Sequence, residues 1–397
     1  MTASWIIQPR DGMAVRDGRP NDGRSQSRSM AFPLPQTVAG AVRTRLGSQG
    51  GGAFSLDPEV AKAIEVAGPL LLRRRLGSSQ AELLLPAPGD ALWAGSRSGE
   101  RRDILPLVPL YEEIHRGGDV PSGVQSGLNA VGLPSSAHLP GKPPLGTPAF
   151  WTWNHLRTWL LGEPLSADEV YRSGERGLEQ DQRVHVAIDP QTGTYVEGAL
   201  FGEPRLTFRS QASRALVDVS ELSLTFKVGS NPSGRELQGG IGHMGGKNLL
   251  LTFEQAERDL WPECPPELLD HVGKTGASAK IRLVLATPGI FDLGWLPSHL
   301  LHLPDADGVT VHIRAAKVDR PLTLSGWDYA AGSKDGRTGS PKPTRRAVPS
   351  GAVYWLELEG PQAHRQEWLK NRWLKSIADT EQDRRDGFGL AVMGVWR

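Results

Sequence analysis

Cysteine is almost missing from this chain of 397 residues, because Cys264 is its single example. One cysteine excludes internal disulfide bonds and zinc sites built from several cysteines. Long apolar segments are missing too: no run approaches the roughly 20 residues that cross a bilayer, and the first residues have no apolar signal-peptide core. We therefore expect a cytoplasmic protein that binds no membrane.

A net charge of either sign is also missing. The chain has 45 Lys and Arg against 44 Asp and Glu, which gives a formal charge of +1. This balance excludes a bulk polycation, so a nucleic-acid surface has to be a local stripe. Arginine outnumbers lysine by 34 to 11. Arginine is favoured where phosphates, stacked bases or carboxylates are bound, although a GC-rich genome produces the same bias.

Glycine and proline, by contrast, are abundant, with 47 and 31 residues. Together with the length, they predict two or three domains of short elements joined by many loops. The pattern predicts strands at 2–8, 68–73, 83–90, 204–209, 215–226, 248–253, 281–287, 309–318, 351–358 and 389–396, and a hairpin at 183–201. It predicts helices at 36–46, 57–66, 150–161, 251–260, 266–272 and 362–380.

This order of elements predicts an α+β fold with two antiparallel sheets, each carrying helices on one face. A continuous alternation of strand and helix around a nucleotide-binding turn is not found. We place one domain at residues 1–205 and the other at 206–397. The Gly-, Pro- and Ser-rich residues 115–147 form an insertion in the first domain.

Residues 32–44, Phe-Pro-Leu-Pro-Gln-Thr-Val-Ala-Gly-Ala-Val-Arg-Thr, follow the first predicted strand. Pro35 and Thr37 predict a helix start, with the Thr37 hydroxyl capping a free N–H of the first turn. Gly40 allows a close approach to the helix backbone. Arg43 can add a bidentate phosphate contact at a helix N-terminus, which attracts anions. An ordinary strand-to-helix turn is the alternative interpretation.

Residues 238–247, Gln-Gly-Gly-Ile-Gly-His-Met-Gly-Gly-Lys, are the richest in glycine. Consecutive glycines can offer backbone N–H groups to a phosphate, with Lys247 as a charge partner. The spacing fits neither a P-loop nor a dinucleotide fingerprint. We expect RNA-backbone contact here, and the alternative is a flexible hairpin tip. The glycines concerned are Gly239, Gly240, Gly242, Gly245 and Gly246.

His243 is the one acid/base candidate in this segment. Histidine exchanges protons near neutral pH and could serve a ribose oxygen. No second histidine or tyrosine stands at a spacing that suggests a catalytic dyad, so a structural or RNA-contacting role is the alternative. The remaining histidines show no metal-ligand spacing, and we expect no metal, no cofactor and no catalytic residue.

Residues 325–355 form a second dense block, with Ser-Gly-Trp-Asp at 325–328 and a basic, proline-bounded segment after it. Trp327 could stack on a base while Lys342, Arg345 and Arg346 follow its phosphates. Prolines restrict the segment, so less entropy is lost when it is ordered. The alternative is that Trp327 fills a core and the basic residues are only solvated.

Eight segments in one order resemble the third subunit of the Cmr complex, the type III-B CRISPR effector, in the RAMP superfamily. They include Leu-Pro-Ala-Pro-Gly-Asp, Met-Gly-Gly-Lys, Ser-Gly-Trp-Asp and Gly-Phe-Gly-Leu-Ala-Val-Met-Gly-Val-Trp. The resemblance covers nearly the whole chain, at residues 32–44, 85–90, 183–201, 244–247, 283–297, 325–328, 341–355 and 387–396.

The resemblance implies two ferredoxin-like domains of the RNA-recognition-motif type (βαββαβ). It implies binding of the 5′ handle of the CRISPR RNA, docking on the large polymerase–cyclase subunit, a place beside the first RAMP backbone subunit, and target RNA nearby. It also implies that the chain is not itself the nuclease that cleaves target RNA. The chain departs from the family pattern in the mid-chain loop, where an acidic residue and an arginine usually follow the paired glycines. Here Lys247 is followed by Asn and Leu.

Three functional hypotheses follow. The first is a non-catalytic, handle-binding subunit acting in antiviral defence against foreign RNA. The second is a RAMP-type, metal-independent endoribonuclease that processes CRISPR RNA with His243. The third is a nucleotide-binding or scaffold protein in which the glycines serve only turns.

Overall fold

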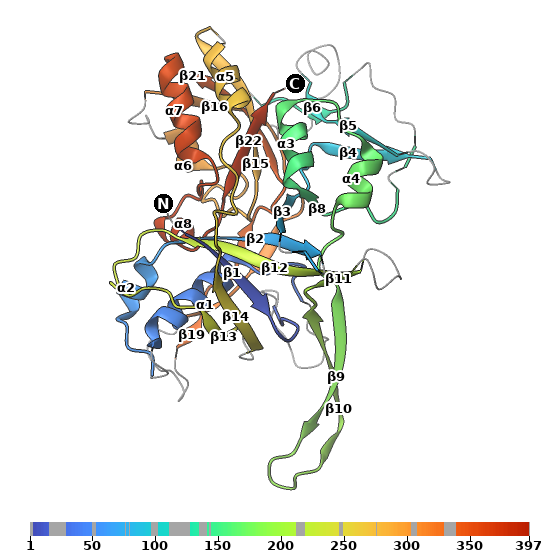
Figure 1. Cartoon of the computed structure of the whole chain (residues 1–397), viewed down its shortest axis with the longest axis vertical. Coiled ribbons are helices and arrows are strands. Elements are labelled where there is room, and N and C mark those ends of the chain that lie inside the picture. The colour runs from blue at the N-terminus through green and yellow to red at the C-terminus, as the bar shows by residue number, and fades with distance from the viewer. Residues whose placement is uncertain are drawn as a thin grey trace. The chain divides into compact units, whose positions relative to one another are not determined.

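A computed structural model of the chain contains helices and antiparallel sheets (Figure 1). It describes residues 3–15, 29–49, 53–75, 77–78, 80–96, 102–110, 128–134, 141–142, 144–211, 219–245, 249–274, 276–302, 308–328 and 339–396. The predicted α+β class with antiparallel sheets is confirmed. The predicted insertion at 115–147 falls largely outside the described residues.

The chain divides into two compact units that interleave along the sequence. Unit 1 comprises Met1–Ala81, Gly177–Asp259 and Leu322–Ala347, and unit 2 comprises Glu82–Arg176, Leu260–Pro321 and Val348–Arg397. This division differs from a single boundary near residue 205. The reason is strand pairing: a strand that follows residue 205 returns to the sheet begun at the N-terminus.

Unit 1 contains a sheet in the order β13-β14-β1-β12-β2, with every pair antiparallel. The strands are β1 (Ser4–Pro9), β2 (Val66–Arg75), β12 (Val219–Val228), β13 (Gly240–Met244) and β14 (Leu249–Gln255), and β11 (Arg209–Gln211) also pairs with β12. Alternation decides the buried face, where Ile7 of β1 lies opposite Leu224 of β12 and both are fully buried.

The described helices of unit 1 are α1 (Pro35–Gly47) and α2 (Pro58–Ala63). Val38, Val42 and Leu46 form one stripe of α1 and are fully buried, so the helix covers the sheet. Pairs of strands make up the rest of the described part of this unit. They are β9 (Gln180–Ile188) with β10 (Tyr195–Leu206), β17 (Leu322–Leu324) with β20 (Arg345–Ala347), and β18 (Trp327–Asp328) with β19 (Ser340–Pro341).

Unit 2 contains an antiparallel sheet in the order β16-β21-β15-β22. These strands are β15 (Ser278–Leu285), β16 (Thr310–Lys317), β21 (Val353–Glu359) and β22 (Ala391–Val395). The helices are α3 (Trp153–Leu161), α4 (Ala167–Ser173), α5 (Pro266–Lys274), α6 (Ser298–His302), α7 (Gln362–Arg372) and α8 (Glu381–Arg385). Smaller pairs join β3 (Ala81–Pro86) to β8 (Phe150–Thr152), β4 (Ala91–Gly95) to β5 (Arg102–Pro106), and β6 (Val108–Pro109) to β7 (Val131–Gly132).

A buried ion pair anchors unit 2. Arg282 on β15 donates to the carboxylate of Asp90 and to the main-chain carbonyl of Trp159. The Trp159 indole Nε1 donates to Asp90 at 3.0 Å. Asp90 is fully buried and Arg282 is 2% exposed. The aspartate of the Leu-Pro-Ala-Pro-Gly-Asp segment therefore joins the loop after β3 to α3 and the central strand β15.

Several predicted boundaries are wrong for local reasons. Thr37 does not cap α1: the helix begins at Pro35, and Leu34 occupies the N-cap without a side-chain hydrogen bond. Phe150–Thr152 is a strand, and Thr152 caps α3 by accepting from His155 N. The helix predicted at 251–260 is wrong because this apolar run continues strand β14. The helix predicted at 362–380 ends at Arg372. The hairpin predicted at 183–201 is confirmed.

Candidate nucleic-acid interface

Helix α1 presents one bare face to solvent. At 100° per residue, Thr37, Gly40 and Thr44 fall on the side opposite the buried stripe, and we call these three residues the α1 stripe. Gly40 and Thr44 are exposed, and a Cβ added at Gly40 would meet no atom within 4 Å. The Thr44 hydroxyl donates to Gly40 O at 2.8 Å. The stripe is thus a length of about 10 Å of helix whose backbone can be approached closely.

One flank of the stripe is the β18–β19 hairpin. Gln36 Nε2 donates to Ser325 O at 2.7 Å, and Lys342 N donates to Gly326 O at 2.8 Å. Trp327 pairs with Pro341 and is 38% exposed. Asp328 of β18 also lies close enough to α2 to affect Lys62. The pKa of Lys62 is raised first by its hydrogen bond with Glu59 and also by the negative charge of Asp328. The sequence-predicted Trp327 and Lys342 therefore lie beside the N-terminal part of α1, and Trp327 is not a core plug.

The other flank is the start of β13. Arg45 donates to three main-chain carbonyls, from Nε to Gln238 O at 3.2 Å, from Nη2 to Gly239 O at 2.6 Å and from Nη1 to Ile241 O at 2.8 Å. Arg45 projects from α1 on the side away from Gln36. One guanidinium therefore fixes the glycine segment against the C-terminal part of the helix.

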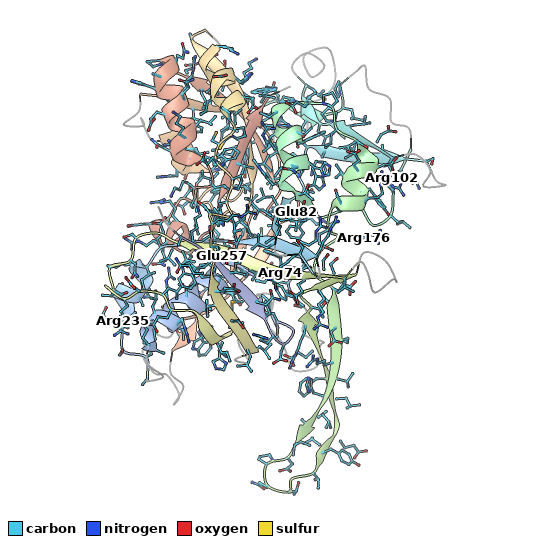
Figure 2. All side chains as sticks on the ribbon, in the orientation of Figure 1. Arg74, Glu82, Arg102, Arg176, Arg235 and Glu257 are labelled. Carbon is cyan, nitrogen blue, oxygen red and sulfur yellow. The ribbon has the colours of Figure 1, made fainter. Side chains whose placement is uncertain are left out.

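Arg235 strengthens the same flank. Its Nη1 donates to Leu46 O at 3.0 Å and Gly47 O at 3.1 Å, and its Nη2 donates to Ser55 Oγ at 3.0 Å. These bonds satisfy carbonyls at the end of α1 that have no partner within the helix. Figure 2 shows Arg235 beside α1 and α2. Gln49 also donates to Glu236 O.

The described part of the glycine segment is mainly a strand. Gly240 and Gly242 lie in β13 and pair with Phe253 and Leu251 of β14. Gly240 has φ +115° and Gly245 has φ +81°, a backbone region that disfavours side chains. A Cβ at Gly242 would stand 2.7 Å from the Phe253 ring, and one at Gly239 would stand 3.2 Å from Phe253 O. The backbone conformation or the space around each of these four glycines thus explains why a glycine stands there, without any contact to RNA. Gly246 and Lys247 lie outside the described residues.

His243 lies on β13 opposite Leu250 of β14. Its neighbours on the same face include Ile241, 64% exposed, and Leu250, 41% exposed. This face is the one turned away from α1, since Gly240 on the other face would carry a Cβ 3.1 Å from Arg45 Nη2. His243 and the α1 stripe therefore do not share one face of the sheet.

The other predicted cations have defined positions in unit 1. Arg43 donates from Nε and Nη2 to Ile64 O, at 3.3 and 2.7 Å, and so ties α1 to the residue after α2. Arg345 and Arg346 lie on β20 and pair with Leu324 and Thr323 of β17. A phosphate contact by any of the three stays a prediction. Arg43 has a structural role in addition.

Sequence reasoning missed Arg45, Gln36 and Arg235, which hold this surface together. No local motif marks them, because their partners are carbonyls 188 to 289 residues away in the sequence. The helical wheel offers one signal. It separates Arg43 from Arg45 by about 200°, so only one of the two can face the glycine strand.

Two further features are absent from the described parts of the chain. No three His, Cys, Asp or Glu side chains there come together as a metal site. No helix there is long and apolar enough to cross a membrane.

Comparison with known proteins was made by sequence and by structure. A family model described as "CRISPR-associated protein (Cas_Cmr3)" matches residues 5–396. No curated protein matches the sequence. Similar solved chains come from the type III-B Cmr-beta complex bound to cognate target RNA, with and without AMPPnP. Both are 15% identical, cover 89% of this chain and 86% of their own, and have TM-scores of 0.44 and 0.45, respectively.

The family match confirms the resemblance that the eight sequence segments indicate. It spans almost the entire chain and includes both compact units. The chain belongs to the Cas_Cmr3 family of CRISPR-associated proteins, the family of a subunit of the type III-B Cmr ribonucleoprotein.

Proposed function

We propose that this chain is the non-catalytic subunit that holds the 5′ handle of the guide RNA in a type III-B effector and docks the large polymerase–cyclase subunit beside the first backbone subunit. The observation that carries the RNA role is the α1 stripe. It is open to solvent at Gly40, and segments pinned by Gln36 and Arg45 border it on both sides.

The chemistry of this surface suits single-stranded RNA. A helix face without a side chain at its centre lets a sugar–phosphate backbone come close. Trp327 on one flank offers a ring for a base, and Lys342, beside it, offers a cation. Main-chain groups, one aromatic ring and a few cations are the usual means of binding an extended strand.

We propose further that each unit is built on a ferredoxin-like core. In unit 1 the order β14-β1-β12-β2 is 4-1-3-2 when these four strands are numbered along the chain. In unit 2 the order β22-β15-β21-β16 is again 4-1-3-2. All neighbours are antiparallel, as the split βαβ arrangement requires. In unit 1, α1 follows the first of its four strands, and in unit 2, α7 follows the third.

Gly40→Trp tests the RNA role, because the protein itself has space for the added side chain. Glycine is a poor helix former, so the variant should fold as well as the parent. If RNA crosses the α1 stripe, the assembled complex should bind a handle-bearing guide at least about tenfold more weakly, a loss of about 1.4 kcal/mol. Ala363→Trp, on an exposed position of α7, is the matched control. Equal guide affinity for the Gly40→Trp and Ala363→Trp complexes would refute the assignment. If Gly40→Trp weakens binding of a handle-less guide by the same factor, the stripe binds RNA but not the handle.

Gly240→Val and Gly245→Val are poorer tests, because positive φ strains valine whether or not RNA is bound. The absence of catalysis is tested separately. We expect no cleavage of repeat RNA or target RNA by the purified protein, with or without divalent metal. Metal-independent cleavage that disappears in His243→Ala would establish the processing endoribonuclease instead.

A further inference from the structure

The segment between β15 and α6 in unit 2 contains a tight turn at residues 291–296, which we call the Leu293 turn. Gly294 N donates to Phe291 O at 3.0 Å, and Gly294 has φ +77°. Phe291 also forms a bridge with Gly294, and Leu293 forms one with Leu296. The turn belongs to residues 283–297, one of the eight segments that carry the family resemblance, and the RNA role of α1 makes no use of it.

Side chains of unit 2 hold the Leu293 turn in place. The Asp379 carboxylate accepts three hydrogen bonds, from Asp292 N at 2.8 Å, from Ser298 Oγ at 2.6 Å and from His299 N at 2.8 Å. The hydroxyl of the buried Tyr354 donates to Trp295 O at 2.6 Å. Because these bonds fix both sides of the turn, little conformational entropy remains to be lost when the turn binds a partner.

The leucine at the apex of this turn is exposed to solvent. Leu293 is 57% exposed, whereas Phe291 is 4% exposed and has its ring centroid 6.3 Å from that of Tyr354. Trp295 and Leu296 of the same turn are half-buried. A single exposed leucine needs no explanation by itself. Here the fold holds an apolar apex rigidly away from the core, with further apolar residues next to it, and such residues form the buried core of protein–protein interfaces.

The chain around the turn has no permanently charged cation. Residues 283–313 contain no lysine and no arginine, and Asp292 is exposed on the turn itself. The three histidines of this stretch carry at most a partial charge at neutral pH. RNA is held chiefly through cations that neutralise its phosphates. The turn's own sequence therefore favours a protein partner over RNA.

The segment packed against the turn supplies little positive charge either. Arg384 donates to Ala378 O at 2.8 Å and to Asp379 O at 2.6 Å, so its guanidinium is bound to main-chain carbonyls. Arg385 forms an ion pair with Glu381. Lys375 is the lysine closest in sequence to Asp379, and it is exposed. One lysine against the exposed Asp292 leaves no basic groove in which a base or a phosphate would be held.

We propose that the Leu293 turn inserts into an apolar pocket with a basic rim on a neighbouring protein subunit of the type III-B assembly. The apolar pocket follows from the exposed leucine, and the basic rim follows from charge complementarity with Asp292. A second copy of this chain is the weaker candidate, because two such turns would bring two Asp292 carboxylates together. The inference rests on the docking part of the proposed function, for which it names a surface, and it is independent of the RNA role of α1.

Leu293→Asp tests the anchor, and Leu145→Asp is the matched control, because Leu145 is 92% exposed in another turn of unit 2. Cells express wild-type and variant chains with different tags, and the assembly is purified through another subunit. We expect Leu293→Asp to enter the assembly about tenfold less often than wild type, Leu293→Ala to show a smaller loss, and Leu145→Asp to enter like wild type. Equal entry of Leu293→Asp and wild type, or an equal loss for the two aspartate variants, would overturn the proposal.

Photo-crosslinking locates the occupant without placing a charge in the turn. A benzophenone amino acid replaces Leu293 or, as the control, Leu145. We expect position 293 to crosslink to a different polypeptide of the purified assembly several-fold more than position 145. Crosslinking to RNA, to a second copy of this chain, equally from both positions, or to nothing would refute the inference.

These measurements separate this inference from the proposed function. If the wild-type chain does not enter a type III-B assembly, the docking part of the proposed function fails. If wild type enters and both Leu293 measurements are negative, only the assignment of the Leu293 turn fails. Failure of the RNA role would appear with Gly40→Trp and would leave both Leu293 measurements unaffected.

Discussion

Arginine is used differently in the two units. In unit 2, Arg282 and Arg365 are 2% and 1% exposed, and they donate to a buried carboxylate and to main-chain carbonyls inside the unit. In unit 1, Arg43, Arg45 and Arg235 are bound to carbonyls at the protein surface. In both units the guanidinium joins segments that are far apart in sequence. The excess of arginine over lysine is therefore weak evidence for RNA binding, because at least these five serve the fold.

The largest effect is expected from the buried pair of unit 2. Asp90→Ala should lower the free energy of unfolding by about 3–5 kcal/mol, because Arg282 would remain charged and without its carboxylate partner in the core. Thermal or urea unfolding measures this loss. The double variant Asp90→Leu with Arg282→Met should recover much of it, since the uncompensated charge is gone.

The matched control is the exposed pair of unit 1, Arg74 Nη2 with Glu221 at 2.7 Å, whose side chains are 49% and 36% exposed. Glu221→Ala should cost less than about 1 kcal/mol. A similar cost for Asp90→Ala and Glu221→Ala would contradict the contrast between a buried and a surface use of arginine.

A smaller and more local effect is expected from Arg45. Arg45→Ala removes three hydrogen bonds from a half-exposed cation, and we expect a cost of about 1–2 kcal/mol. Amide hydrogen exchange should accelerate at residues 239–242, and guide-RNA affinity should fall. Arg45→Lys should rescue little, because an ammonium lacks the planar fork that reaches three carbonyls. Arg10→Ala, which removes an exposed bond to Thr252, should leave exchange at 239–242 unchanged. If Arg10→Ala accelerates exchange at residues 239–242 as much as Arg45→Ala does, Arg45 has no special role in positioning the glycine segment.

Local chemistry made part of this molecule predictable. The hairpin at 183–201 follows from two alternating runs around Asp-Pro-Gln-Thr-Gly, and the register confirms it. Helix α1 was expected from its segment, but its first residue was not: Pro35, which has a fixed φ and no N–H, occupies the first helical position, so Thr37 lies inside the first turn and not at the N-cap. The interleaving of the units was not predictable, since β12 pairs with β1 across more than 200 residues.

In the candidate surface, too, some features follow from local sequence and others are decided only by the packed fold. Gly40, Trp327 and Lys342 were found from residue type and local pattern, and they lie on or beside the α1 stripe. Arg43 was chosen for its place near the helix start, while Arg45 holds the glycine strand. A helix places these two arginines about 200° apart, and only the packed sheet decides which one meets β13. Residue type thus pointed to parts of the candidate surface, and tertiary packing decides which arginine holds the glycine strand.

The smallest expected effect is pH-dependent and concerns a half-buried pair of unit 2. Glu357 accepts from Ser278 Oγ at 2.9 Å and from Arg314 Nε at 2.9 Å. Burial acts to raise the pKa of Glu357, but the Ser278 hydroxyl and the Arg314 guanidinium outweigh it, so the pKa is lowered overall. A lowered pKa in the folded state adds stability above the pKa of the unfolded chain, about 4.3, and this stability is lost as the pH falls through the folded pKa. Glu357→Gln should therefore cost less than about 1 kcal/mol at pH 7, and this cost should shrink as the pH falls below about 4.3. Urea unfolding of both proteins across this range measures the difference. A difference that stays constant as the pH falls from 7 to well below about 4.3 would show that the amide perturbs packing, and that the charge of Glu357 contributes nothing to unit 2.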